Sequence, residues 1–162
     1  VDLVRFTSNL RSVFTPFPRH RVVSRAEFGV VEIASGDRVD LAPSLNFFAG
    51  GNQSIRGFSY HSVGNEIEVF RDDGTKKTLV VGGDRLAIGS LEYQYYFSDN
   101  WRGALFVDGG DAFDEGEFDF KYGAGFGVHY ITPIGAVRVE LAQDLSEDNP
   151  DWQLHLTVGA EF

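Results

Sequence analysis

The chain has 162 residues, of which 43% are hydrophobic and 14% aromatic, and this is enough for one ordinary domain with an apolar core. Its formal net charge of -10 argues against binding to nucleic acid, which relies on clustered Lys and Arg. The sequence contains no cysteine, which excludes thiolate chemistry, and no apolar run approaches the roughly 20 residues of a membrane-spanning helix.

Apolar side chains recur at every second position through most of the chain, which is the spacing of a strand with one apolar face. In chain order this alternation predicts seven strands, at about residues 1–15, 20–32, 84–98, 100–111, 120–132, 135–145 and 151–162. The last strand is the clearest, and its apolar face carries Trp152, Leu154, Leu156, Val158, Ala160 and Phe162. The sequence therefore predicts an all-β, antiparallel protein.

The predicted connections alternate between short and long. The short ones are "PFPRH", "SDN" and "TPIG", and the long ones are about residues 33–83, "DAFDEGEFD" and "SEDNPD". Short turns at one end and long loops at the other are typical of an up-and-down outer-membrane β-barrel. Within the longest connection, "RDDGTKK" at 71–77 predicts a hairpin turn, because Asp-Gly favours tight turns.

Two classes of barrel share this alternation. A soluble barrel such as a lipocalin turns its apolar face inward, whereas a membrane barrel turns it toward lipid. Aromatic residues gather near the strand ends, as in an interfacial girdle: Tyr93, Tyr95, Tyr96, Phe97, Trp101, Tyr130 and Phe162. We therefore expect a transmembrane barrel whose polar face lines the interior.

The segment "FFAGGNQSIRGF" resembles the lumen-inserted loop-six motif of the outer-membrane assembly superfamily, of the BamA and TamA type. The family motif is Val or Ile, then Arg-Gly, then Phe or Tyr, and Ile55, Arg56, Gly57 and Phe58 match it. "GSLEYQYYF" and "ALFVDGGDAF" resemble the strands that follow this loop in the family. The double glycine with "QSIRGF" is most similar to the TamA branch, and the resemblance implies that the loop at about 33–83 enters the barrel lumen.

Glu92 and Asp108 lie on the polar faces of neighbouring predicted strands, so both carboxylates should point into the interior. A guanidinium offers five donors to two carboxylates in a geometry that lysine cannot copy. We therefore predict that Arg56 is a latch for the inserted loop. The alternative is an Arg56 that sits at a solvated loop tip, where ion pairs contribute little.

Other patterns favour structural interpretations. "GAGFG" at 123–127 predicts a small-residue stripe along a strand rather than a dinucleotide fingerprint. His20, His61, His129 and His155 lack metal-ligand spacing, and no nucleophilic constellation is present. We expect no metal, no cofactor and no enzymatic activity.

Seven strands pose a closure problem, because single-chain membrane barrels have at least about eight and open edges leave backbone groups unpaired in hydrocarbon. The sequence opens without a signal-peptide pattern. We expect residues 1–162 to be the C-terminal part of a barrel whose remaining strands, and by resemblance POTRA domains, lie elsewhere in a longer protein. Alone, the chain should dimerise or self-associate.

The resemblance also implies a function in the Gram-negative outer membrane. Members of the assembly branch insert client β-barrel or autotransporter proteins, and their last strand forms one side of a lateral seam. Here that strand would run from Trp152 to Phe162, with Gly159 as a kink, and its alternation ending in Phe162 resembles the signal carried by clients. Implied partners are unfolded client proteins, outer-membrane lipids and a TamB-like inner-membrane-anchored protein. A two-partner secretion pore that exports an unfolded polypeptide remains the alternative.

Overall fold

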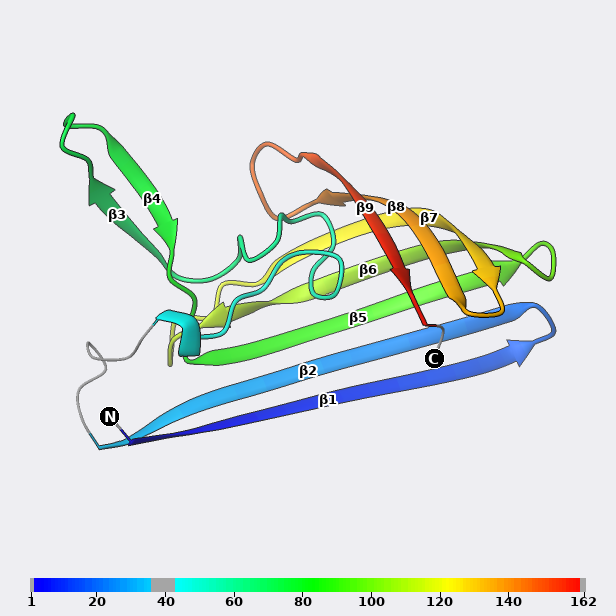
Figure 1. The fold of residues 1–162 in the computed structure, drawn as a ribbon, viewed down its shortest axis with the longest axis horizontal. Helices are drawn as coiled ribbons and strands as arrows, with labels where there is room; N and C mark the ends of the chain where they lie inside the picture. The colour runs from blue at the N-terminus through cyan, green and yellow to red at the C-terminus, as the bar shows by residue number, and fades with distance from the viewer. Residues whose placement is uncertain (1, 36–42, 161–162) are drawn as a thin grey trace.

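A computed structural model describes residues 2–35 and 43–160 (Figure 1). Its strands are β1 (Asp2–Phe17), β2 (His20–Ser35), β3 (Glu66–Phe70), β4 (Lys76–Val80), β5 (Arg85–Tyr96), β6 (Trp101–Phe113), β7 (Lys121–Thr132), β8 (Gly135–Asp144) and β9 (Trp152–Gly159). A 3-10 turn, η2, spans Pro43–Leu45. No helix in these described ranges has the length and apolar character needed to cross a bilayer.

Seven of the described strands form one antiparallel sheet in the order β1-β2-β5-β6-β7-β8-β9, while β3 and β4 form a separate hairpin. The short connections lie at one end of the sheet and the long ones at the other. The sheet is strongly curved but not closed, and the chain between η2 and β3 lies within its concavity (Figure 1). The predicted all-β, up-and-down, incomplete barrel is therefore confirmed.

The two faces of the sheet differ as the alternation predicts. On β5, for example, Leu91 and Tyr93 are exposed on the convex face, whereas Glu92 between them is buried on the concave face. The same division continues on β6, where Leu105 is exposed and Asp108 is buried. The apolar side chains thus point outward, which agrees with a membrane barrel and not with a lipocalin-like one.

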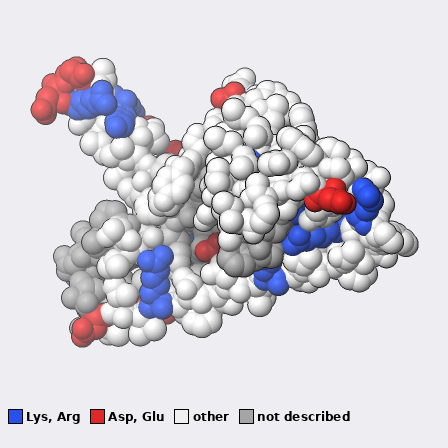
Figure 2. All heavy atoms as spheres, turned by 45° about the vertical axis from the view of Figure 1, so that its right-hand side comes forward, with Lys and Arg blue, Asp and Glu red and all other residues white. Residues whose placement is uncertain are grey.

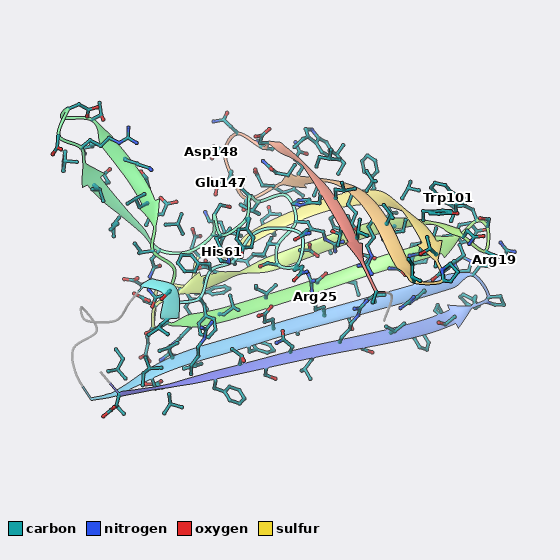
Figure 3. All side chains as sticks on the ribbon, in the orientation of Figure 1. Arg19, Arg25, His61, Trp101, Glu147 and Asp148 are labelled. Atoms are coloured by element: carbon teal, nitrogen blue, oxygen red, sulfur yellow. The ribbon has the colours of Figure 1, made fainter. Side chains whose placement is uncertain are left out.

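Aromatic side chains form a band at each end of this outward face. At the short-turn end, where Figure 3 labels Trp101, its ring lies 4.8 Å from that of Tyr130 on the neighbouring strand. At the long-loop end the rings of Phe118, Phe120 and Tyr122 follow one another at 6.2 and 5.7 Å. Two aromatic bands that flank an apolar belt are typical of outer-membrane barrels.

The concave face is not polar throughout. Near the long-loop end it packs against the chain between η2 and β3 in one apolar cluster, formed by Val31, Phe47, Ala49, Ile55, Phe58, Val63, Leu86, Ile88 and Ala112. Two antiparallel bridges, Phe47–Gly83 and Ala49–Val63, hold this part of the loop together. The expectation of a polar interior therefore applies only to the rest of the concave face.

The β3–β4 hairpin extends away from the sheet (Figure 1). Its turn lies at the predicted position, where the Gly74 amide donates to the Arg71 carbonyl oxygen. Charged side chains gather at its tip (Figure 2), and an exposed ion pair joins Lys76 to Glu68 at 2.8 Å. The Asp73 carboxylate accepts hydrogen bonds from the Thr75 hydroxyl and amide, which lower its pKa.

Candidate functional site

The segment from residue 50 to residue 58 is a compact turn on the concave side of the sheet. The Gly51 amide donates to the carbonyl oxygens of Ile55 and Phe58, at 3.2 and 3.0 Å. The Ile55 and Phe58 side chains are buried in the apolar cluster. With these two neighbours anchored in apolar surroundings, the Arg56 side chain lies in the polar part of the interior.

The Arg56 guanidinium meets both predicted acceptors. Its Nε donates to Asp108 Oδ2 at 2.7 Å and its Nη2 to Asp108 Oδ1 at 2.9 Å, a bidentate pair. Its backbone amide also donates to Asp108 Oδ2, at 3.0 Å. Nη1 donates to Glu92 Oε2 at 2.6 Å. The alternative in which Arg56 sits at a solvated loop tip is therefore wrong, because the Arg56 side chain is buried among carboxylates of the barrel wall.

A third carboxylate, which sequence reasoning missed, completes the group. Arg56 Nη1 also donates to Glu140 Oε1 on β8, at 3.1 Å, and the guanidinium carbon lies 3.4 Å from the ring centroid of Phe106. Glu140 alternates with apolar residues in "AVRVELAQD", which marks it as inward-facing. Nothing in that pattern indicates that β8 curves far enough around to bring this side chain to Arg56.

These contacts stabilise the charged form of Arg56. Burial alone lowers the pKa of a guanidinium, but the hydrogen bond and charge of Asp108, with the charges of Glu140 and Glu92, outweigh it and raise the pKa of Arg56 above its usual value. Arg56 therefore stays protonated. Its contacts are a fixed ion cluster and not a proton relay.

Glu92, His129 and Glu140 bring three possible ligand atoms within 4.8 Å of one another, the proximity that a metal site needs. Arg56 Nη1, however, donates to both of these carboxylates. A guanidinium at this position already supplies the positive charge that the two acids require. We therefore assign the cation of this cluster to Arg56.

A second buried chain of hydrogen bonds supports Glu140. Arg102 Nε donates to His129 Nδ1 at 2.9 Å, and His129 Nε2 lies 2.9 Å from Glu140 Oε1. Because Nδ1 is the acceptor, the hydrogen-bond network assigns the imidazole proton to Nε2, which donates to Glu140. Arg102 and His129 are both 0% exposed. His129 thus positions a carboxylate and is a structural histidine.

The turn also contacts the last described strand. The Gly57 amide donates to His155 Nε2 at 3.1 Å, and Asn52 Nδ2 donates to Thr157 Oγ1 at 3.0 Å. We call these two bonds the β9 clamp. On the opposite side of the turn, Arg25 Nη2 donates to the Ser54 carbonyl oxygen at 2.9 Å from β2, where Figure 3 labels it. One short turn therefore joins strands from across the sheet.

Two glycines allow this close approach to the wall. Gly57 has a φ of 99°, and a Cβ there would lie 2.8 Å from the Asp144 amide nitrogen on β8. On β7, a Cβ at Gly123 would collide with the Arg56 carbonyl oxygen. The glycines of "GAGFG" thus leave the room in the interior that the small-residue interpretation predicts.

The predicted seam residues lie on β9 as the alternation requires. Trp152, Leu154, Leu156 and Val158 are exposed on the outward face, and Gly159 is the last residue of the strand. Among the described strands, β9 pairs with β8 alone. Phe162 lies outside the described residues. The roles of seam and client signal stay predictions.

Comparison with known proteins agrees with the geometry. The model of the Omp85 superfamily domain matches residues 1–162. Among solved structures the chain is similar to BamA from Haemophilus ducreyi lacking POTRA domains 1-3, with a TM-score of 0.78 and 20% sequence identity. The similarity covers 94% of this chain and 34% of that one, so the chain spans about a third of that structure. At this identity the likeness concerns the fold.

Proposed function

Because the chain belongs to the Omp85 superfamily and lies in the Gram-negative outer membrane, we propose that it is the C-terminal part of a barrel that assembles other proteins into that membrane. The proposed reaction is the insertion of client β-barrel or autotransporter proteins. The chain would supply no bond-making chemistry, since the buried charges at the centre of the site, Arg56 with Asp108, Glu92 and Glu140, are engaged in holding the inserted turn.

The observation that carries this proposal is the latch, by which we mean Arg56 with Asp108, Glu92 and Glu140. A loop that returns into a barrel interior needs contacts with the wall to keep it there. The latch joins β5, β6 and β8, three strands that are not all neighbours in the sheet. It can therefore keep the wall in one curvature while the edge beyond it stays open.

The proposed client site is the free edge of β9. A strand paired on one side presents unpaired amide and carbonyl groups on the other, and an incoming strand can add there by main-chain pairing. The outward side chains Leu154 and Leu156 are apolar, which suits a strand that passes directly into lipid. Missing strands and POTRA domains of the whole protein, and a TamB-like partner, belong to the same proposal.

The test uses the full-length protein in proteoliposomes with an unfolded client barrel. We expect Arg56→Ala to reduce client folding, measured as the heat-modifiable band on a gel, and to expose the turn to protease. The matched control is Arg71→Ala, which removes an exposed arginine from the hairpin of the same loop. Unchanged client folding and unchanged protection in Arg56→Ala would refute the proposal. If Arg56→Ala folds the client normally but no longer exports an unfolded polypeptide, the protein is a secretion pore instead.

A further inference from the structure

The outward face of the sheet contains a groove of about 580 Å³ across β2, β5 and β6. Its floor is a row of small residues placed side by side by the strand register, in which Ala26 pairs with Gly89 and Gly89 pairs with Gly109. Larger apolar side chains, such as Leu91 and Val107, lie next to these three small residues on the same strands. The floor spans roughly 10 Å, the width of three neighbouring strands.

Large apolar side chains form the walls of the groove. Phe28 lies on the long-loop side of the floor and Leu91 on the short-turn side, and they are 48% and 52% exposed. Tyr122, which pairs with Gly109, closes the end at β7. The ring of Phe120, 55% exposed, leans over the floor, since a Cβ at Gly109 would lie 2.6 Å from its Cζ. Gly89 has no such neighbour within 4 Å and leaves the centre open.

We propose that this groove is a binding site for one acyl chain of an outer-membrane lipid. The convex face around the groove faces the bilayer, so lipid acyl chains are the molecules that surround it. The groove lies on strands that have sheet neighbours on both sides, so no further barrel strand can cover it. Its place beside the 114–120 loop, at the long-loop end, assigns it to the outer leaflet.

The shape of the groove is the physical reason why it would retain an acyl chain. Lipid tails are as apolar as leucine, so exposed apolar side chains gain nothing from the hydrophobic effect in a bilayer. A concave, aromatic-walled groove instead gives a chain many more dispersion contacts than a convex wall does. The bound chain would also lie directly outside the latch, because Ser90 and Asp108 adjoin Gly89 and Gly109 on the same strands.

The test is photolabelling of the full-length protein in vesicles that contain phosphatidylethanolamine with a diazirine in one acyl chain. We expect labelling at Phe28, Leu91 and Phe120 to exceed that at Leu105 and Val128, which are equally outward-facing. Gly89→Leu fills the floor and should abolish this excess. Phe120→Ala removes one wall of the groove and should reduce the excess labelling at Phe28 and Leu91.

The matched control is Gly103→Leu, at an outward glycine of β6 where the nearest contact for a Cβ is 4.0 Å away, outside the groove. Gly103→Leu should leave the excess labelling unchanged. The difference in gel mobility between heated and unheated samples checks that each variant forms its barrel. Equal labelling of groove and convex residues in the unaltered protein would overturn the proposal, as would full labelling in Gly89→Leu. A diazirine on the headgroup that labels the groove better than the acyl probe would also overturn it. None of these outcomes depends on client insertion.

Discussion

At the scale of single residues, the site is dominated by one buried cation that satisfies three carboxylates. Asp108 accepts three of the hydrogen bonds of Arg56, whereas Glu92 and Glu140 accept one each. Burying such a group carries a large desolvation cost, so its net contribution to stability is small or of either sign. Removing one member is a different matter, because the remaining charges stay buried without compensation.

We therefore expect Asp108→Asn to destabilise the full-length barrel by about 3 kcal/mol, the lower part of the range for one partner of a buried pair, because Glu92 and Glu140 remain. Urea unfolding in detergent micelles measures this loss. The control is Glu68→Gln, which breaks the exposed pair with Lys76 in the same loop and should cost far less, since solvent screens that pair. Equal losses in the two variants would contradict the latch.

A second prediction at this scale concerns Gly57. Gly57→Ala should destabilise the barrel by about 2–5 kcal/mol, because a positive φ and a collision with the β8 backbone act together. Gly116→Ala separates the two causes, since Gly116 has a φ of 83° but open space around it. Gly116→Ala should lower the free energy of unfolding only by the cost of placing alanine at a positive φ, about 1–2 kcal/mol. The same unfolding titration compares them, and indistinguishable losses would show that close approach is unimportant.

At the scale of elements, β9 is held by the inserted turn as well as by its pairing with β8. It has eight residues, whereas β1 and β2 have 16 each, and β8 is its one described strand neighbour. The β9 clamp adds two bonds from the concave side, at His155 and Thr157. Because β9 is short and has one strand neighbour, it can open at a low cost in free energy.

We expect Thr157→Val and His155→Phe, each alone, to speed amide hydrogen exchange in β9 by about two- to tenfold, the effect of one lost hydrogen bond. Exchange in β5 and β6 should not change, because their pairing is untouched. Leu156→Val, on the outward face of the same strand, is the control and should leave β9 protection as it is. Protection that is the same in all three variants would show that the clamp does not hold the strand.

At the scale of the whole molecule, the described sheet has two free edges, at β1 and β9. Its apolar outward face suits a membrane, yet unpaired edge groups in hydrocarbon cost several kcal/mol each. We expect residues 1–162, produced alone and folded in detergent, to dimerise through these edges or to self-associate further. Light scattering coupled to size exclusion measures the mass. A monodisperse monomer would contradict this prediction.

Much of this protein follows from local sequence patterns. Alternation determines the strands and which face of each is apolar, since successive side chains of a strand point to opposite sides. Short connections make consecutive strands neighbours, so the inward carboxylates of Glu92 and Asp108 had to lie on adjacent strands. The Arg-Gly motif supplied their cation. Each of these inferences needs only neighbours in the chain or in the sheet.

The tertiary structure decided which distant groups converge. Glu140 reaches Arg56 from β8, and His155 reaches Gly57 from β9, because the sheet curls back over the turn. The apolar cluster around Phe47 and the groove at Gly89 likewise arise from packing between separate segments. Curvature accumulates from small twists at every strand pair, and no single stretch of sequence encodes its sum.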